Sequence, residues 1–314
     1  MPHRLIFIEK GVGGGDDAGK NTTHGRNTTI LTEDGMRVEK KLTPHELHVY
    51  EVLAPYVLEL LRGKPPIHIP FLFRKEFAGI SSLISLPAFP QHQHSFTESY
   101  GAGTPGYEPY IFPTILQAFE SIRQCIPSSL FPESLDDDRD EYFLPRIQHA
   151  YADIPNNVLE DLTEDSFQAL MQKTSPALTL PRLSAHRDAH HQNWNVVTIR
   201  NEHHVQLIDL ETFGLARPGW DEARIYSRFC LSEQKQDSFL DAFHAAEHLK
   251  DHQIHLYFWR CVAYKTLKGL HHLYGQHHAK KLNMLSDTQQ IVEEVTRGRL
   301  RTLHRAKKEI QLLQ

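Results

Sequence analysis

Residues 186–193, HRDAHHQN, have the spacing H-R-D-x-x-x-x-N, which is typical of loops that catalyse phosphoryl transfer. That reaction needs a carboxylate that orients an attacking hydroxyl and accepts its proton, and it needs hard oxygen ligands for Mg²⁺. Asp188 and Asn193 have the side chains for these two tasks. A lone Asp or Asn in a loop is more often a turn or cap residue, so the prediction depends on the whole pattern.

A second carboxylate, Asp209, closes the short apolar run VQLID. This run and WNVVTI both have the composition of strands, and the turn residues 200–202 separate them, so the sequence predicts a hairpin. Such a hairpin brings Asp209 back beside Asn193. The ordered set of Asp188, Asn193 and Asp209 therefore predicts a kinase-like site.

These segments resemble the aminoglycoside phosphotransferase and choline kinase group of small-molecule kinases. HRDAHHQN at 186–193 matches H-x-D-x-H-x-x-N, IDLE at 208–211 matches I-D-x-[DE], and PGWDEARI at 218–225 is similar to the segment that ends in an aspartate before a helix. The resemblance implies a fold of class α+β, the bilobal protein-kinase-like fold. Its N-lobe is a small antiparallel sheet, and its C-lobe is larger and mainly helical.

The resemblance implies a role for each matching residue. Asp188 is implied as the catalytic base, and Asn193 and Asp209 as the Mg²⁺ ligands. Asp221 is implied to anchor the catalytic loop from below through hydrogen bonds.

Four further residues have supporting roles by the same resemblance. His186 and His190 are expected to brace the catalytic loop, and Arg187 is expected to steady that loop or reach phosphate. Glu211 is expected to approach the second metal or the substrate.

The resemblance also implies a lysine on the third strand that pairs with a glutamate of the following helix. Because side chains alternate along a strand, Met36, Val38 and Lys40 share one face. Lys40 is therefore the preferred lysine, Lys41 is the alternative, and Glu46 is the expected partner. Two adjacent lysines on a half-exposed strand can equally face solvent.

The nucleotide base is expected to lie against the strand that ends in SLISLPAF, with Ile84, Ser85 and Leu86 near the hinge. The resemblance implies ATP as the nucleotide, with GTP as the alternative. It implies Mg²⁺ as the metal cofactor.

The glycine-rich run GGGDDAGKNTT has nearly the spacing of a P-loop, but Asn21 stands where a hydroxyl is required. The residues that follow favour a loop and then a strand, and a P-loop needs a helix there. The run instead lies between two predicted strands, where kinase-like folds cover phosphates. The N–H groups of Gly13, Gly14 and Gly15 can donate to phosphate there, although the carboxylates at 16–17 oppose it.

The N-terminal part of the chain is predicted to be rich in strands. Composition and turn signals predict strands at residues 4–9, 28–33, 36–42, 70–77 and 81–89. Thr43 before Pro44 predicts the start of a helix that continues through the apolar run ending near residue 61. Residues 90–109 are rich in Pro, Gly, Ser and His, which predicts a linker.

Helical periodicity dominates the rest of the chain. Helices are predicted at 111–125, at 157–173 and from about 233, with a strand-rich island at 183–210 and a helix starting near Trp220. The predicted domains are an N-lobe at 1–89, a linker at 90–109 and a C-lobe at 110–314. The acidic segment 132–141 is predicted to be a solvated loop, with a rim that attracts a cationic substrate as the alternative.

Composition excludes several classes of protein. The net charge of −5 over 314 residues gives no general attraction to nucleic acid. The basic run RGRLRTLHRAKK has apolar residues at helical spacing, so it is predicted to be the solvated face of an amphipathic C-terminal helix. Three widely spaced cysteines do not indicate a disulfide framework, and no membrane span or signal-peptide core is visible. We therefore expect a cytoplasmic protein with no membrane or nucleic-acid partner.

The expected function is a small-molecule kinase that transfers the γ-phosphate of ATP, or of GTP, to a hydroxyl of a small acceptor. An aminoglycoside, an amino alcohol or a sugar would each fit. One alternative is a protein kinase, although the sequence lacks D-F-G and A-P-E. Another is a nucleotide-binding regulatory protein that has lost catalysis. The sequence does not indicate an oligomeric state.

Overall fold

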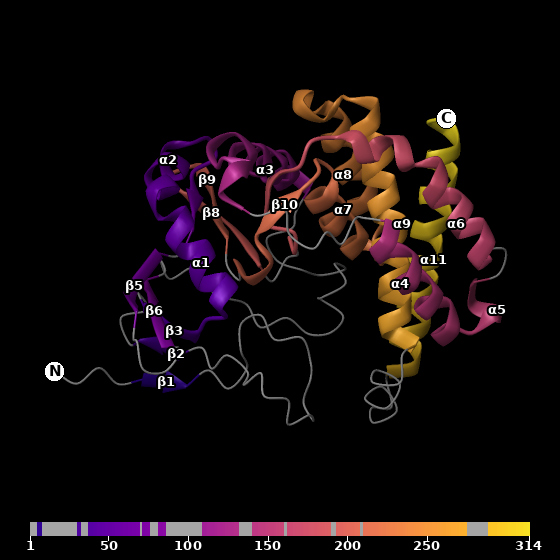
Figure 1. Cartoon of the computed structure of the whole chain (residues 1–314), viewed down its shortest axis with the longest axis horizontal. Coiled ribbons are helices and arrows are strands. Elements are labelled where there is room, and N and C mark those ends of the chain that lie inside the picture. Colours follow the sequence, from indigo (N-terminus) through magenta and orange to yellow (C-terminus); the bar gives the residue numbers. More distant parts are fainter. Residues whose placement is uncertain are drawn as a thin grey trace.

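In the residues that it describes, the computed structural model of the chain combines many helices with three small sheets, so its class is α+β. Figure 1 shows the largest sheet towards one end of the molecule and a group of long helices towards the other. The described residues are 5–7, 30–32, 37–69, 71–75, 81–85, 109–131, 140–159, 162–189, 193–207, 210–274 and 288–314. The glycine-rich run, almost all of the predicted linker and most of the acidic segment lie outside these residues.

The largest sheet has five antiparallel strands in the order β1-β2-β3-β6-β5. They are β1 (Leu5–Phe7), β2 (Ile30–Thr32), β3 (Arg37–Lys41), β5 (Phe71–Lys75) and β6 (Ser81–Ser85). All five strands predicted in this part of the sequence are confirmed. β3 pairs with both β2 and β6, so it is an inner strand of the sheet.

Helix α1 (Pro44–Leu53) follows β3, as predicted. The Thr43 side chain accepts a hydrogen bond of 3.1 Å from the backbone N–H of Glu46, which satisfies one of the free donors at the helix start. The predicted continuous helix to residue 61 is wrong, because the 3₁₀ turn η1 (Ala54–Tyr56) separates α1 from α2 (Val57–Arg62). Pro55 lies in that turn and has no backbone N–H to continue the α-helical hydrogen bonds.

A second sheet contains the predicted hairpin. Strands β8 (Trp194–Ile199) and β9 (Glu202–Leu207) pair antiparallel, and Arg200 and Asn201 form the two-residue turn with φ values of 51° and 66°. Positive φ at both turn residues matches the twist of a two-residue hairpin. The hairpin is confirmed, although Glu202 belongs to β9 and not to the turn. Strand β4 (Ile67–His68) adds to β9 in parallel and was not predicted, because two residues are too short a run to recognise.

A two-stranded sheet pairs β7 (Leu183–Ala185) with β10 (Gly214–Ala216). β7 leads directly into the predicted catalytic loop. The strand-rich island is thus confirmed, and β10 extends it beyond the predicted boundary at residue 210.

The helices after the predicted linker agree with the sequence prediction in part. The first group is η3 (Pro109–Ile111), α3 (Phe112–Cys125), η4 (Ser128–Leu130), α4 (Asp140–Asp153), α5 (Asn156–Leu159), α6 (Glu164–Lys173) and η5 (Ser175–Thr179). α3 confirms the helix predicted at 111–125. The single helix predicted at 157–173 is wrong, because α6 has its own start, where Thr163 caps the N–H of Ser166. α4 was not predicted.

The second group builds the helical core. It consists of η6 (Leu210–Thr212), α7 (Trp220–Tyr226), η7 (Ser227–Phe229), α8 (Glu233–Ala245), η8 (Glu247–Leu249), α9 (His252–Tyr274) and α11 (Thr288–Leu312). α9 packs against α4, α7 and α11, and most of its residues are buried. Leu303, Ala306 and Ile310 of α11 are fully buried, which confirms the predicted amphipathic C-terminal helix. Among the described residues, no helix combines the length and apolar composition that a membrane span requires.

A buried ion pair joins α3 to α7. Arg123 Nη2 donates to Glu222 Oε1 at 2.7 Å and to Oε2 at 3.0 Å, and the Glu222 side chain is fully buried. A charge left in such a place without its partner costs far more than one at the surface.

We therefore expect Arg123→Met to lower the free energy of unfolding by about 3–5 kcal/mol, measured by denaturant titration. Lys250→Met is the matched control, because it removes an exposed pair with Glu247 at 2.5 Å and should cost less than about 1 kcal/mol. Equal losses in the two variants would contradict a special role for the buried pair.

Candidate active site

Helix α7 holds the loop that follows β7. The carboxylate of Asp221 accepts hydrogen bonds from the backbone N–H of His186 at 3.0 Å and of Arg187 at 2.8 Å. Trp220 Nε1 donates to the Arg187 carbonyl at 2.9 Å, and Thr212 Oγ1 donates to the His186 carbonyl at 3.0 Å. The two residues that precede Asp188 are therefore fixed through all four of their backbone polar groups.

This network lies in the interior. Asp221 is 1% exposed and His186 is fully buried. Burial raises the pKa of Asp221 above its ordinary value, and the nearby His186 opposes that shift. The two N–H donors compensate a carboxylate that would otherwise lose its hydration without replacement.

The backbone of Arg187 takes an uncommon conformation, with φ at 69°. This left-handed region costs energy for a residue with a side chain, and such strain persists only where the surroundings hold it. Asp221 and Trp220 provide those contacts, so the turn that presents Asp188 depends on α7.

The start of α7 requires a glycine. Gly219 has φ at 102°, and a Cβ there would lie 3.2 Å from Phe258 N and 3.3 Å from Ile254 O of α9. The Gly219 N–H donates to Glu222 Oε2 at 2.9 Å, which caps the helix. The sequence PGWDEARI thus starts a helix in close contact with α9.

The side chain of Asp188 is oriented by Arg224, on the same helix. Arg224 Nε donates to Asp188 Oδ1 at 2.8 Å, and Arg224 Nη2 lies 2.6 Å from the same oxygen. The Asp188 side chain is 31% exposed, so it lies at the surface of the site and not in the core. The guanidinium thus fixes the position of the carboxylate, which is a group that can accept a proton.

Asn193 lies beside Asp188. Its Nδ2 donates to the Asp188 carbonyl at 3.0 Å, and the residue is 1% exposed. Its Oδ1 is buried and has no hydrogen-bond partner among the described residues. A buried amide oxygen without a partner suits a hard cation such as Mg²⁺, so this residue fits the implied metal.

Asp209, the other predicted metal ligand, lies outside the described residues, as does His190. Leu207, two positions before Asp209, pairs with Trp194, which directly follows Asn193. Within the described ranges, no group of three His, Cys, Asp or Glu side chains is arranged to hold a metal. The pairing of Asn193 with Asp209 therefore stays a prediction.

The other supporting residues lie close to the loop. The His186 ring lies 5.9 Å from the Trp194 ring, centroid to centroid. Glu211 is exposed in η6, next to the Thr212 that contacts the loop. The structure therefore places Glu211 beside the loop at the surface.

For the lysines predicted in the N-terminal part, the structure describes the backbone position but not the side chain. Lys40 and Lys41 lie in β3 opposite Ser82 and Ser81 of β6, and their side chains lie outside the described part of the structure. Glu46 is fully buried in α1. The α1 helix packs against η6, and His45 Nε2 is 3.0 Å from the Phe213 carbonyl. A pair between a β3 lysine and Glu46 stays a prediction.

The residues predicted around the nucleotide base lie in β6 or beyond it. Ile84 pairs with Val38 of β3 and with Leu72 of β5, so β6 is an inner strand. Ser85 ends that strand, opposite Arg37 and Phe71. The remaining nucleotide predictions lie outside the described residues: Gly13, Gly14, Gly15 and Leu86.

Two residues of the site escaped the sequence prediction, Arg224 and Lys265. The Lys265 ammonium of α9 lies 3.7 Å from the centroid of the Trp220 ring, and the residue is only 8% exposed. Burial, together with the charge of Arg224, lowers the pKa of Lys265 from 10.5 to about 7. The nearby Cys261 and Asp188 oppose the shift. The sequence signal was weak, because Lys265 lies within a long and largely apolar helix.

Lys265 predicts a pH dependence of stability. Between pH 7 and 10.5 the unfolded lysine holds a proton that the folded lysine lacks, so the free energy of unfolding rises with pH through this window. This gain in the free energy of unfolding is lost as pH falls back towards 7. Below pH 7 the contribution of Lys265 does not change with pH. We expect Lys265→Met to reduce the slope between pH 7.5 and 9.5 by about 1 kcal/mol per pH unit, measured by denaturant titration. Lys308→Met, at an exposed position of α11, should leave the slope unchanged, and an unchanged slope in both variants would contradict the assignment.

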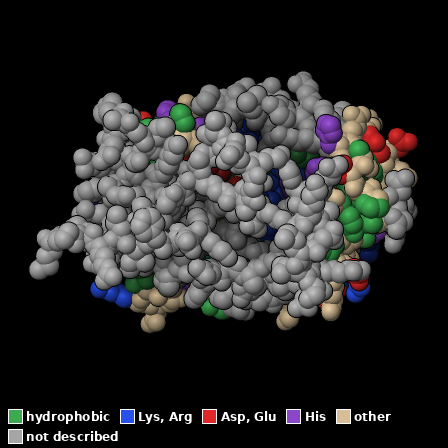
Figure 2. Space-filling model, turned by 90° about the horizontal axis from the view of Figure 1, so that it is seen from below, with side chains coloured by type: hydrophobic (Ala, Val, Ile, Leu, Met, Phe, Trp, Pro, Cys, Tyr) green, Lys and Arg blue, Asp and Glu red, His purple; other side chains and the backbone are tan. Residues whose placement is uncertain are grey.

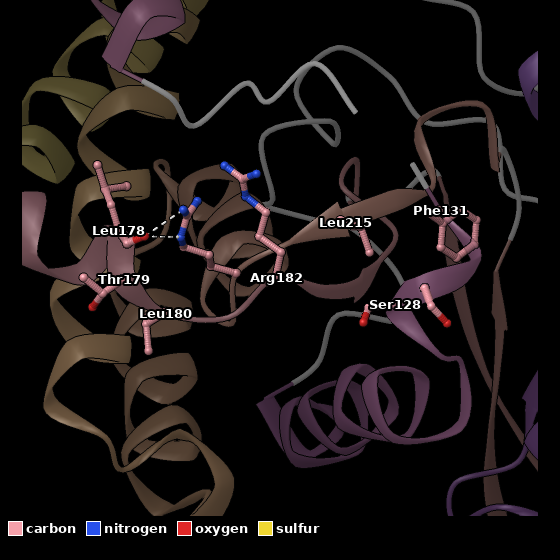
Figure 3. A pocket seen from close by; sticks show the side chains of 9 residues that line it. Ser128, Phe131, Leu178, Thr179, Leu180, Arg182 and Leu215 are labelled. Carbon is pink, nitrogen blue, oxygen red and sulfur yellow. Dashed lines mark hydrogen bonds between the residues drawn. The ribbon is translucent and has the colours of Figure 1, made fainter. Parts of the chain in front are cut away.

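Two cavities lie near these elements. The larger, of about 650 Å³, is lined by residues of η4, η5 and β10 and by Arg182 and Arg217 (Figure 3). Arg217 donates to the Leu178 carbonyl through Nε at 3.0 Å and Nη2 at 2.7 Å, as the dashed lines in Figure 3 show. Arg182 directly precedes β7, and Asp188 follows the end of that strand by three residues. The smaller cavity, of about 460 Å³, lies between α4 and α9.

Comparison with known proteins defines the fold. No protein-family model and no curated protein sequence matches the chain. Among solved structures, a microcompartment-associated aminopropanol kinase has a TM-score of 0.60 and 13% identity, over 99% of this chain and 95% of that one. The GDP complex of wild-type aminoglycoside 2′-phosphotransferase-IIIa has a TM-score of 0.54 and 14% identity, over 93% and 92%. A choline/ethanolamine kinase family protein from Mesorhizobium loti has a TM-score of 0.51 and 14% identity, over 91% and 90%.

At these identities the similarity establishes the fold. The chain has the fold that the aminoglycoside phosphotransferases share with choline/ethanolamine and aminopropanol kinases, so the resemblance seen in the sequence is confirmed at that level. Its function depends on the chemistry of its own site.

Proposed function

We propose that the protein is a small-molecule kinase that transfers the γ-phosphate of ATP, with GTP as the alternative nucleotide, to a hydroxyl of a small acceptor. The observation that carries the proposal is the placement of Asp188. Its carboxylate is oriented by Arg224 at 2.6 Å and is accessible at the end of a loop that α7 fixes. Asn193, with its buried oxygen, lies directly beside it.

In this proposal Asp188 orients the acceptor hydroxyl and takes its proton. The acceptor oxygen forms a bond to the γ-phosphorus while the bond from that phosphorus to the bridging oxygen breaks. The electron pair of the broken bond stays on the β-phosphate of ADP, which leaves. The work of the chain is thus positioning and proton acceptance.

Asn193 and Asp209 would hold Mg²⁺ in this proposal. The ion, when bound, neutralises negative charge that develops between the β- and γ-phosphates. Asn193 supports the assignment because its Oδ1 is buried without a hydrogen-bond partner among the described residues.

Nucleotide binding is proposed from the fold and the N-terminal sequence. Structures with the same fold were solved with GDP, one of them with kanamycin as well. Lys40 is proposed to contact phosphate while paired with Glu46, and Lys41 is the alternative. Backbone N–H groups of the glycine-rich run are proposed to cover the phosphates.

The segment before α7 argues against a protein kinase. From Phe213 to Gly219 every residue is buried, and the chain passes directly through β10 into the helix. This leaves no exposed segment there that could order on phosphorylation and receive a peptide. A small acceptor is therefore the better proposal.

The test is Mg²⁺-dependent release of ADP or GDP, with ATP and GTP compared. Acceptors should include aminoglycosides, amino alcohols, sugars, hydroxy acids, sugar phosphates and a generic protein substrate. Release that a small acceptor stimulates supports the proposal. Binding of Mg·ATP without release for any acceptor would instead favour a regulatory nucleotide-binding protein.

A further inference from the structure

A lysine of α9 contacts the tryptophan that holds the catalytic loop. The Lys265 ammonium lies 3.7 Å from the centroid of the Trp220 ring. The edge of the same ring contacts the loop, since Trp220 Nε1 donates to the Arg187 carbonyl at 2.9 Å. Arg187 directly precedes Asp188 in the chain. The indole of Trp220 thus connects the ammonium to the turn that presents the proposed base.

The packing of α9 on α7 sets this contact. Ile254, Phe258 and Lys265 recur at helical spacing, so they lie on one face of α9. Gly219, directly before Trp220, lies so close to this face that a Cβ there would be 3.2 Å from Phe258 N. Trp220 is 4% exposed and Lys265 is 8% exposed. The ring and the ammonium are therefore held together by closely packed helices, and their contact is not a flexible one at the surface.

Burial makes this ammonium costly. Figure 2 shows Lys and Arg side chains, and Asp or Glu side chains, recessed in a hollow near the middle of the lower face. A recessed charge loses hydration, and burial together with the charges of Arg224 and Lys268 lowers the pKa of Lys265 to about 7. The nearby Cys261 and Asp188 oppose that shift. Groups with such perturbed pKa values are concentrated at functional sites, so the cost indicates a role in the site.

The ammonium restrains the orientation of the indole. The face of an aromatic ring carries negative charge and attracts a cation, and the attraction grows where water is excluded. The indole N–H points along the plane of the ring, so a tilt that breaks the hydrogen bond to Arg187 also turns the face away from Lys265. Arg187 has φ at 69°, a conformation that persists only where its surroundings hold it. The contact of Lys265 with the ring face thus helps to maintain this turn.

We propose that Lys265 is a positioning residue of the kinase, which holds the Trp220 ring where it binds the Arg187 carbonyl and so keeps Asp188 in place. The inference rests on the proposed function, in which Asp188 takes the proton of the acceptor hydroxyl. Lys265 acts through Trp220 and contacts no substrate. Its loss therefore lowers kcat, because a small displacement of the base slows the reaction, and leaves nucleotide binding unchanged.

The experiment uses Lys265→Met, which keeps an unbranched side chain and removes the charge. At pH 6.0 most of the wild-type ammonium is charged, because its pKa is about 7. With saturating Mg·ATP, and with kanamycin, aminopropanol, choline and ribose as acceptors, we expect Lys265→Met to lower kcat about 5- to 30-fold. The KM for ATP should be unchanged. The Tm should be no lower than that of wild type, because methionine avoids burial of a charge. Turnover and stability thus separate, which a purely structural role does not predict.

Trp220→Phe tests the route through the indole. Phenylalanine keeps an aromatic ring but has no N–H for the Arg187 carbonyl. In a Trp220→Phe background, Lys265→Met should lower kcat by less than about twofold, because the hydrogen bond that it supports is already absent. Lys265→Arg keeps a cation that can stack on the ring and should retain most of the wild-type kcat. Lys308→Met changes an exposed lysine of α11 and should alter neither kcat nor Tm.

NMR separates this inference from the proposed function, because it needs no turnover. The chain has three tryptophans, and Trp220→Phe assigns the indole N–H signal of Trp220. We expect this N–H to exchange with D₂O faster in Lys265→Met than in wild type. If no acceptor is phosphorylated, the kinase proposal fails, and faster exchange would still support the positioning contact. Unchanged exchange, an unchanged kcat, or losses that multiply in the double variant would overturn the inference.

Discussion

Asp188→Asn is expected to lower kcat by about 10²- to 10⁴-fold, the usual contribution of a general base. The amide keeps the size of the carboxylate but cannot accept the proton of the acceptor hydroxyl. The affinity for Mg·ATP should change little, because the base contacts the acceptor and not the nucleotide in the proposed arrangement. Steady-state kinetics and a nucleotide titration of the same preparation measure both quantities.

The control for this variant is Asp165→Asn, which changes an exposed carboxylate in the first turn of α6. It should leave kcat unchanged. The pair between Asp188 and Arg224 is partly exposed, with side chains 31% and 24% accessible, so its loss should cost less than about 1 kcal/mol of stability. A folded Asp188→Asn protein with normal turnover would exclude Asp188 as the base.

Asp221→Ala is expected to have the second large effect, on stability and turnover together. It leaves the N–H groups of His186 and Arg187 buried without an acceptor, at a cost of about 2–5 kcal/mol in the free energy of unfolding. It also removes a contact that holds Arg187 at φ 69°, so the turn before Asp188 can relax. A shift of about 1 Å in Asp188 would lower kcat roughly 100-fold.

Asp221→Asn distinguishes anchoring from a general loss of stability. The amide oxygen can still accept one of the two hydrogen bonds, so this variant should lie between wild type and Asp221→Ala in both kcat and stability. Arg123→Met, which removes the neighbouring buried ion pair, gives a variant of comparable instability whose loop contacts remain. If Arg123→Met lost as much turnover as Asp221→Ala at a temperature where both are folded, the anchoring role of Asp221 would be refuted.

Local patterns predicted those parts of the fold that local chemistry determines. The turn at Arg200 and Asn201 and the cap at Thr43 are set by neighbouring residues, so the hairpin and the start of α1 followed from the sequence. β4 did not, because its two residues form a strand only through β9, more than a hundred positions later in the chain. The breaks at Pro55 and Thr163 show that apolar periodicity can continue across a helix end.

The residues of the candidate site also fall into two groups: those that local sequence patterns indicate and those that only tertiary packing brings to the site. The spacing of HRDAHHQN singles out Asp188 and Asn193, because phosphoryl transfer needs a carboxylate and an amide oxygen at that separation. The sequence could have indicated Arg224, because it stands three positions after Asp221 and so on the same face of a helix. The sequence could not have indicated Lys265, since its place beside Trp220 results from the packing of α9 on α7.

The central claim is phosphoryl transfer to a small hydroxyl compound, and mass spectrometry of the reaction mixture tests it most directly. Wild-type protein and Asp188→Asn should each be incubated with Mg·ATP and the acceptor set, with the products analysed for an acceptor heavier by one phosphoryl group. We predict that this product forms with the wild type, in equal amount to ADP, and is lost with Asp188→Asn. ADP formation without any phosphorylated acceptor, or a phosphorylated product that forms equally well with Asp188→Asn, would contradict the account.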